Sequence, residues 1–461
     1  MKNFWTSLLG SLAAMVIFAA VVLVVVLGFI GIAVAVGGGD RQPTFAKGSY
    51  LVLDLSRAIT DAPGALDLGS LPIGGLPKTI QLHDVTRALR LAANDSRVAG
   101  VLIKGSLGAS GASSGFATLR EVRAALSTFR AAGKPVRAYL TNAGTADYYV
   151  ASAGGEVVLD PFGVIEMPGL ASEPMFFAQA FEKYGVGIQV TRVGKYKSAI
   201  EPFTRSDMSP ESKEQLQKLL GDIWTDVVAQ IATSRAIPPE QLQALVDAEG
   251  LLQPAKAKEA KLIDRSAYLD EVIADLIKET GLAAGTRKTF KQIDVADYAK
   301  LATGPDGPGG VAKTGEGGSS SPGKLALVYA EGEIVDGEGG PGEIGAARYA
   351  REIRQLRQDN SVKAIVLRIN SPGGSATASE AIQRELRLAR GAKPVIVSMG
   401  DYAASGGYWI AAYGDRIFAQ PGTITGSIGV FGVQFDIQKL ARDFGVTFDR
   451  VKTGEIGRAH V

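Results

Sequence analysis

The sequence of 461 residues contains no cysteine and only two histidines, His83 and His460. Without cysteine the chain has no disulfides, no thiolate nucleophile and no cysteine-ligated zinc. With so little histidine, a Ser-His-Asp triad and a histidine-rich metal site are poorly supported. We therefore expect no metal and no other cofactor. A nucleophilic hydroxyl would need Lys, Asp or Glu as its base.

An excess of one charge sign is missing as well. The chain has 49 Lys and Arg residues against 47 Asp and Glu residues, which gives a formal net charge of +2. Proteins that bind nucleic acid usually carry a basic stripe or patch, and no basic cluster in this sequence is long enough to form one. Nucleic acid is therefore not an expected partner.

The N-terminal region is strongly apolar. Residues 8–36 contain no charged side chain and consist mainly of Leu, Val, Ile, Ala and Phe. A helix needs roughly 20 apolar residues to cross a bilayer, whereas a cleaved signal peptide has an apolar core of about 7 to 15. The pattern predicts a membrane anchor over residues 1–45, with a long signal peptide cut between residues 33 and 39 as the alternative. Lys2 favours a cytoplasmic N-terminus, which would place the remaining chain outside a bacterial plasma membrane.

Two segments of the chain can be laid over each other. The first copy reads DSRVAGVLIKG at residues 95–105 and GKPVRAYLTNAGTADYYVASAGG at 133–155. The second reads NSVKAIVLRINSPGG at 360–374 and AKPVIVSMGDYAASGGYWIAAYGD at 392–415. Each copy predicts a strand, a helix and another strand, over residues 101–103, 119–131 and 136–140, and over residues 364–369, 378–388 and 395–399. Continuous apolar strands joined through helices indicate an α/β fold with parallel sheets.

The repeat also indicates how the chain is divided. We expect a first repeat over 46–302, mainly helical between 209 and 281, a Gly/Pro/Ser-rich linker over 303–323, and a second repeat over 324–461. The second copy stops at the position equivalent to Lys197, so roughly 100 further residues of the repeat unit are expected. Residues 455–461, EIGRAHV, continue no pattern of the first copy. We expect them to be a spurious tail.

Two glycine-rich elements of the second copy can carry chemistry. Residues 370–374, NSPGG, follow a predicted strand, and their N–H groups could bind an oxyanion, although most such runs are turns. In residues 401–408, DYAASGGY, a strand meets a helix and could expose the hydroxyl of Ser405 above the helix N-terminus. A helix cap would explain this serine equally well. The first copy has Ala146 at the same position, which favours a functional role for Ser405.

A third element and a pair of lysines complete the candidates. Residues 425–430, TGSIGV, offer Ser427 either as a hydroxyl beside the site or as part of a bend after a strand. Residues 192–199, RVGKYKSA, contain Lys195 and Lys197. A lysine acts as a base only when neutral, so burial must lower its pKa from about 10.4. The residues themselves do not choose between the two lysines.

Four strings in this order resemble the bacterial signal peptide peptidases of the SppA type, in their long and internally duplicated form. They are YKSAIEPF at 196–203, DMSP at 207–210, INSPGGS at 369–375 and GDYAASGGYWIA at 400–411. The resemblance extends from the anchor to about residue 453. It implies a fold like that of ClpP and crotonase.

The resemblance also implies a role for individual residues. Ser405 would be the nucleophile and Lys197 the general base, donated by the other repeat. Ser427 would orient the lysine amine, and the N–H groups of Gly374 and Gly406 would form the oxyanion hole.

The resemblance further implies a membrane-attached homo-oligomer, commonly a tetramer, in contact with membrane lipid. Its substrates would be hydrophobic signal peptides left in the membrane after secretion. Two other functions stay open at this point. One is an acyl-CoA enzyme of the crotonase type, which shares the fold and the oxyanion hole. The other is a catalytically inactive membrane scaffold or assembly factor.

Overall fold

The computed structural model describes residues 45–63, 79–110, 114–284, 288–303 and 323–449, with residues 451, 453 and 454 and a few helical residues between 14 and 28. Within this part of the chain no helix is long and apolar enough to span a bilayer. Most of the predicted anchor lies outside the described residues, as do residues 304–322 of the linker and the tail over 455–461. The membrane anchor stays a prediction.

The first sheet confirms the predicted α/β class. Its strands lie in the order β10-β1-β4-β5-β6-β8, with β9 also paired to β6, and only β8 runs antiparallel to its neighbour. The strands are β1 (Ser49–Asp54), β4 (Val98–Lys104), β5 (Val136–Ala143), β6 (Glu156–Glu166), β8 (Leu251–Leu252), β9 (Arg265–Ser266) and β10 (Gln292–Asp294). A separate parallel pair joins β2 (Ala58–Thr60) to β3 (Thr79–Gln81).

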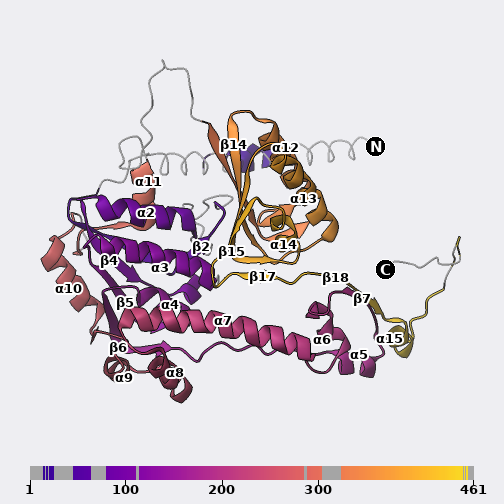
Figure 1. The fold of residues 1–461 in the computed structure, drawn as a ribbon, viewed down its shortest axis with the longest axis horizontal. Coiled ribbons are helices and arrows are strands. Elements are labelled where there is room, and N and C mark those ends of the chain that lie inside the picture. The colour runs from indigo at the N-terminus through magenta and orange to yellow at the C-terminus, as the bar shows by residue number, and fades with distance from the viewer. Residues whose placement is uncertain are drawn as a thin grey trace.

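Helices lie against this sheet (Figure 1) and bury its apolar side chains. Fully buried Leu51, Ile103, Leu119 and Tyr148 belong to one core that the strands and helices build together. The helices are α2 (Leu82–Asn94), α3 (Phe116–Ala131), α4 (Thr145–Ala151), α7 (Pro210–Arg235), α8 (Pro239–Ala248), α9 (Pro254–Glu259), α10 (Leu269–Thr280) and α11 (Val295–Thr303), with the 3₁₀ turn η2 (Leu107–Ser110). The predicted helical stretch over 209–281 is thus confirmed.

The second sheet repeats this arrangement with fewer strands. Its order is β11-β14-β15-β16, β17 also pairs with β15, and all pairs are parallel. The elements are β11 (Lys324–Glu331), β12 (Glu333–Val335), β13 (Glu343–Gly345), α12 (Ala346–Gln358), β14 (Val362–Ser371), α13 (Ala376–Arg390), β15 (Val395–Ala404), α14 (Gly406–Ala411), β16 (Arg416–Phe418) and β17 (Ile424–Gly426). β14 and β15 cover the strands predicted from the repeat, because their apolar residues fill a second core.

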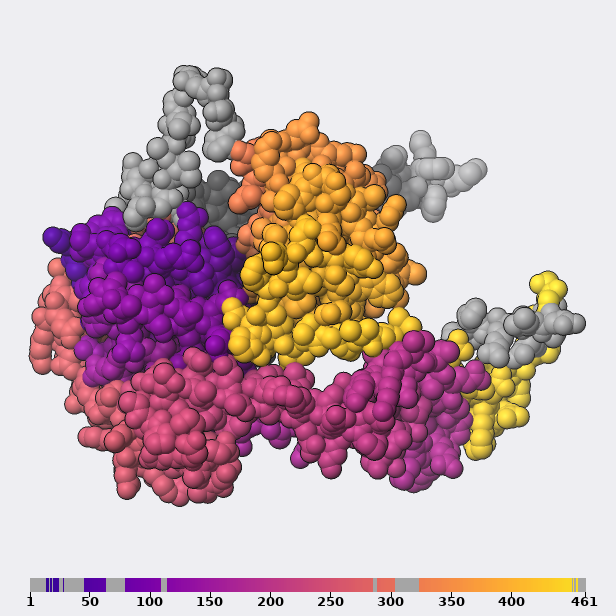
Figure 2. Space-filling model, in the orientation of Figure 1, coloured from indigo at the N-terminus to yellow at the C-terminus, as the bar shows by residue number. Residues whose placement is uncertain are grey.

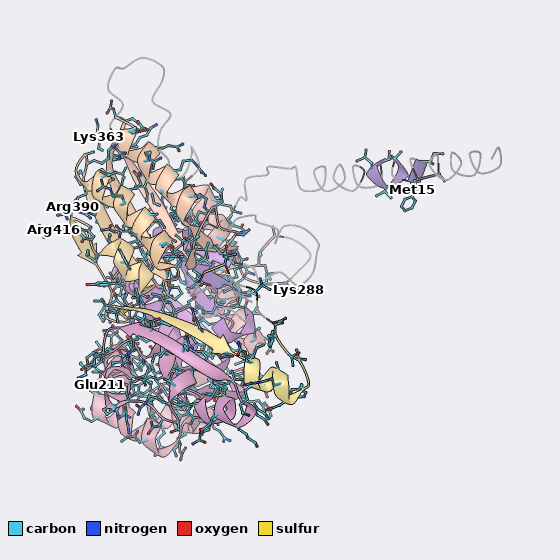
Figure 3. All side chains as sticks on the ribbon, turned by 90° about the vertical axis from the view of Figure 1, so that its right-hand side faces the viewer. Met15, Glu211, Lys288, Lys363, Arg390 and Arg416 are labelled. Carbon is cyan, nitrogen blue, oxygen red and sulfur yellow. The ribbon has the colours of Figure 1, made fainter. Side chains whose placement is uncertain are left out.

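A two-stranded ribbon connects the two halves of the chain. β7 (Gly187–Val193) comes from the first half and pairs antiparallel with β18 (Val430–Asp436) from the second, with Val193 opposite Val430. Figure 3 shows the two strands side by side. In Figure 2 the magenta segment that includes β7 projects from the two repeats. Short elements flank the ribbon: α5 (Ala178–Tyr184), η3 (Ser198–Ile200), α6 (Glu201–Thr204) and α15 (Gln438–Asp443).

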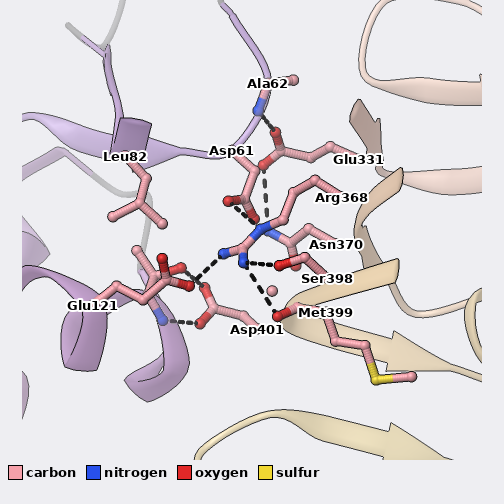
Figure 4. A network of polar contacts seen from close by, with 12 residues as sticks. Asp61, Ala62, Leu82, Glu121, Glu331, Arg368, Asn370, Ser398, Met399 and Asp401 are labelled. Atoms are coloured by element: carbon pink, nitrogen blue, oxygen red, sulfur yellow. Dashed lines mark hydrogen bonds and ion pairs between the residues drawn. The ribbon is translucent and has the colours of Figure 1, made fainter. Parts of the chain in front are cut away.

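A buried ionic network joins the two repeats (Figure 4). Arg368, on β14, donates from Nε to Asp61 Oδ1 at 2.8 Å and pairs with Glu121 of α3 at 2.9 Å. Asp61 is only 4% exposed, and this burial raises its pKa to about 6. The charge of Arg368 opposes the effect of burial only in part, and the charges of Glu331 and Asp401 raise the pKa of Asp61 further.

Candidate active site

Ser405 lies where β15 ends and α14 begins. Its backbone has φ 53° and ψ −117°, close to the first central position of a type II′ turn, which favours glycine. Its N–H donates to Gly426 O at 2.8 Å, so β17 holds the turn from one side. A non-glycine residue in such a conformation is strained, and strain of this kind concentrates at functional sites.

Lys197 reaches this serine from the first half of the chain. Its Nζ lies 2.9 Å from Ser405 Oγ, 2.8 Å from Ser427 O and 3.0 Å from Ser427 Oγ. The residue is 4% exposed. Burial lowers the pKa of its amine, and within the described residues no carboxylate forms an ion pair with it to reverse that shift. Lys197 is thus the kind of lysine that can lose its proton.

Two glycines let the segments around Lys197 approach each other. Gly194 and Gly429 have φ of +107° and +142°, values that side-chain-bearing residues rarely adopt. A Cβ on Gly194 would lie 3.0 Å from Ile428 O, and one on Gly429 would collide with Val193 O and come within 3.3 Å of Lys197 Cβ. The end of β7 and the beginning of β18 therefore pack backbone to backbone beside the lysine.

Hydrogen bonds within the structure link the segment YKSAIEPF, at 196–203, to the segment DMSP, at 207–210. Glu201 is 2% exposed and accepts hydrogen bonds from Ser209 N at 3.0 Å and Ser209 Oγ at 2.5 Å. Ser209 in turn caps α7, as its Oγ accepts from Ser212 N at 3.1 Å. This linkage fixes the turn that follows Lys197 onto the beginning of the long helix.

The predicted oxyanion donors lie around the same turn. Gly406 is the first residue of α14, where N–H groups have no partner within the helix. A Cβ on Gly373 would lie 2.6 Å from Gly406 N and 2.7 Å from Ser405 Cβ. Gly374 follows with its backbone against Ile334, and its N–H donates to no group in the described part of the chain. The close approach at Gly373 was not predicted from the sequence.

The first repeat has no equivalent hydroxyl, as the alignment of the copies predicts. Ala146 takes the place of Ser405, and Asp147 takes the place of Gly406. The Asp147 carboxylate accepts from Leu107 N at 2.7 Å and Ser106 Oγ at 2.8 Å. The residue equivalent to Gly406 in the first repeat is therefore an acid whose carboxylate accepts from neighbouring N–H and O–H groups.

The structure brings together Ser405, Lys197 and Ser427, and it places Gly374 and Gly406 in the adjoining turns. It does not bring Lys195 to this site. Lys195 lies at the surface, where its Nζ pairs with Glu211 at 3.1 Å. The arrangement provides a hydroxyl, a buried amine in contact with it, and nearby backbone donors, which are the parts that acyl transfer needs.

Comparison with known proteins decides the family. The sequence profile of peptidase family S49 matches residues 128–283 and 387–460. The chain is 37% identical over 470 residues to Protease 4 of Salmonella typhi, which covers 98% of this chain and 72% of that protein. The chain belongs to peptidase family S49. This S49 member is accordingly a serine protease, which decides against an acyl-CoA enzyme.

Two further relatives align with most of this chain. Protease 4 of Haemophilus influenzae is 35% identical over 450 residues, covering 94% of this chain and 71% of that protein. The chloroplastic serine protease SPPA of Arabidopsis thaliana is 32% identical over 413 residues, covering 89% of this chain and 57% of that protein. The likeness spans both repeats, in agreement with the long, duplicated form of the family.

Proposed function

We propose that this chain is a membrane-bound endopeptidase in which Ser405 is the nucleophile and Lys197 its general base. The observation that carries the proposal is the 2.9 Å contact between Lys197 Nζ and Ser405 Oγ. A base must lie within hydrogen-bond reach of the proton that it removes. Lys197 meets this condition, although 208 positions in the sequence separate it from the serine.

The contacts of the amine suit its neutral form. A neutral lysine has two N–H donors and one lone pair. Both donors can bind Ser427: one donates to its carbonyl oxygen at 2.8 Å and the other to its hydroxyl oxygen at 3.0 Å. The lone pair then points at the hydroxyl proton of Ser405. Ser427 thereby orients the amine, and burial favours the deprotonated state.

The reaction follows from this arrangement. Lys197 removes the proton of Ser405 as Oγ attacks the scissile carbonyl carbon, and the N–H groups of Gly374 and Gly406 stabilise the resulting oxyanion. The tetrahedral intermediate collapses, the peptide C–N bond breaks, and the Lys197 ammonium gives its proton to the leaving amine. Lys197 then takes a proton from water as the water oxygen attacks the acyl-enzyme carbonyl carbon. The ester C–O bond breaks, and the Lys197 ammonium returns the proton to Ser405 Oγ.

Hydrophobic signal peptides at a bacterial plasma membrane are the proposed substrates. Apolar side chains close in sequence to Ser405 and Ser427 are partly exposed, among them Tyr402, Ile428 and Phe431. An N-terminal anchor over residues 1–45 would keep such a surface beside membrane lipid on the extracytoplasmic side, with the N-terminus in the cytoplasm. Exposed apolar side chains on β18, and Ile437 and Phe444 at the two ends of α15, also favour assembly into a homo-oligomer, for which we propose a tetramer.

A fluorophosphonate probe tests the proposed nucleophile. The full chain should be labelled once, and mass mapping should place the label on Ser405. Ser405→Ala should abolish both labelling and hydrolysis of a hydrophobic peptide without loss of secondary structure. A label on another serine, or hydrolysis that survives Ser405→Ala, would remove Ser405 from the mechanism.

A further inference from the structure

Two corresponding helices of the repeats begin differently. In the second repeat, α13 begins after Ser375, whose Oγ accepts from Ala378 N at 3.2 Å and caps the helix. In the first repeat, α3 begins after Gly115, which has no side chain to act as a cap. The first helix must satisfy its free N–H groups in another way.

The cap of α3 comes from the second repeat (Figure 4). Asp401 Oδ2 accepts from Gly115 N at 2.8 Å, and Oδ1 accepts from Thr118 N at 2.8 Å. The Thr118 hydroxyl adds a third bond to Oδ2 at 2.9 Å. A carboxylate at a helix N-terminus is favoured by the helix dipole as well as by these bonds. Asp401 thus caps the N-terminus of α3, as Ser375 caps the N-terminus of α13.

The fit around Asp401 is close. Asp401 is 7% exposed and Thr118 2%. A Cβ on Gly115 would lie 2.5 Å from Asp401 Cγ. There is therefore no room for both a capping side chain at residue 115 and the carboxylate of Asp401. Asp401 can cap α3 because residue 115 is a glycine and has no side chain.

Asp401 lies on β15 four residues before Ser405. The intervening Tyr402 and Ala404 pair with Ile424 and Gly426 of β17, which leads directly to Ser427. Ile424 packs against the core of the first repeat. The turn that carries Ser405 and the strand that leads to Ser427 are therefore fixed together on the half of the chain that supplies Lys197.

We propose that Asp401 is a positioning residue, which sets the Ser405 hydroxyl against the Lys197 amine by docking the end of β15 onto the N-terminus of α3. This inference rests on the proposed function, because positioning has meaning only if Ser405 and Lys197 react. In this proposal, the helix cap that the second repeat supplies to the first keeps Ser405 aligned with Lys197.

The test separates helix capping from positioning. Asp401→Gly removes the carboxylate, and it also removes the Cβ with which a serine side chain at position 115 would collide. In the full chain, Asp401→Gly should lower the melting temperature and lower kcat for a hydrophobic fluorogenic peptide about 100-fold, while KM changes by less than about threefold. Adding Gly115→Ser gives α3 a cap of its own, so the double variant should regain melting temperature while kcat stays low.

Three outcomes decide between the explanations. If kcat returns together with melting temperature in the double variant, Asp401 is only a structural cap and the inference is wrong. If Asp401→Gly leaves kcat unchanged, the inference is wrong as well. If Ser405→Ala retains hydrolysis, the proposed function itself fails. Asp264→Ala is the matched control: its Oδ2 accepts from Val157 N at 2.7 Å inside the first repeat, so it should lower stability and leave kcat intact.

Discussion

At the scale of single residues, Lys197 and Lys195 form a natural comparison, because they stand two positions apart with opposite surroundings. Lys197→Arg keeps a positive charge that cannot be lost at working pH. It should lower kcat about 10² to 10⁴-fold, the range for loss of a general base. Lys195→Ala, at the surface beside Glu211, should have little effect. Measured peptide hydrolysis checks both, and an active Lys197→Arg would exclude a lysine base.

The pH dependence of activity follows from the same residue. Burial lowers the pKa of Lys197 below its ordinary value of 10.5, and only the neutral amine accepts a proton. The value of kcat/KM should therefore rise with pH through the lowered pKa and level off before 10.5. A kcat/KM profile that stays flat from neutral to alkaline pH would contradict this assignment.

Backbone strain at Ser405 gives a prediction on stability. Its φ of 53° and ψ of −117° suit glycine, so Ser405→Gly should be more stable to denaturant than Ser405→Ala by about 1 kcal/mol. Both variants should be inactive. Equal stability of the two would mean that the turn relaxes once the hydroxyl is gone, which urea unfolding of the pair would reveal.

At the scale of secondary-structure elements, the ribbon of β7 and β18 decides where Lys197 lies. Gly429→Ala should push the strands apart, because its Cβ would collide with Val193 O beside the lysine. We expect kcat to fall at least about tenfold, since small displacements of reacting groups are costly. Gly432→Ala, on the same ribbon, meets only Thr191 Oγ1 at 3.2 Å and should be nearly silent in the same assay.

The elements also show what the sequence could predict. β14, β15, α3 and α13 were predictable because buried strands and amphipathic helices leave local apolar patterns. The pairing of β7 with β18 was not, since both strands are largely exposed and far apart in the chain. Without the family resemblance, Lys197 could not be preferred over Lys195. The contact of Asp401 with α3 was not predicted because its partner Gly115 lies 286 positions away. The uncapped start of α3 was the one local hint.

At the scale of the whole molecule, the network between the repeats makes stability depend on pH. The pKa of Asp61 is raised from 3.8 to about 6, so the folded state binds its proton more tightly than the unfolded state. The corresponding stabilisation is complete below 3.8 and is lost as pH rises through about 6. Relative to Asp61→Asn, the unmodified chain should lose roughly 2 to 3 kcal/mol of unfolding free energy across this window.

Urea unfolding at several pH values measures this difference. Asp264→Asn serves as a control of opposite sign. Burial would raise the pKa of Asp264, but hydrogen bonds from Arg235 and Val157 lower it overall. The stabilisation from Asp264 should therefore fade as the solution becomes acidic. Parallel stability curves for the unmodified chain and Asp61→Asn would show that Asp61 does not titrate in this window.

The carboxylate of Asp147 in the first repeat has a consequence for stoichiometry. Although the chain is built from two similar halves, the first half has Ala146 at the position of Ser405, and the next residue is an acid that accepts from Leu107 and Ser106. Under the proposed mechanism, active-site titration should therefore saturate at a single equivalent per polypeptide, because the two halves would form one composite centre in place of two independent ones.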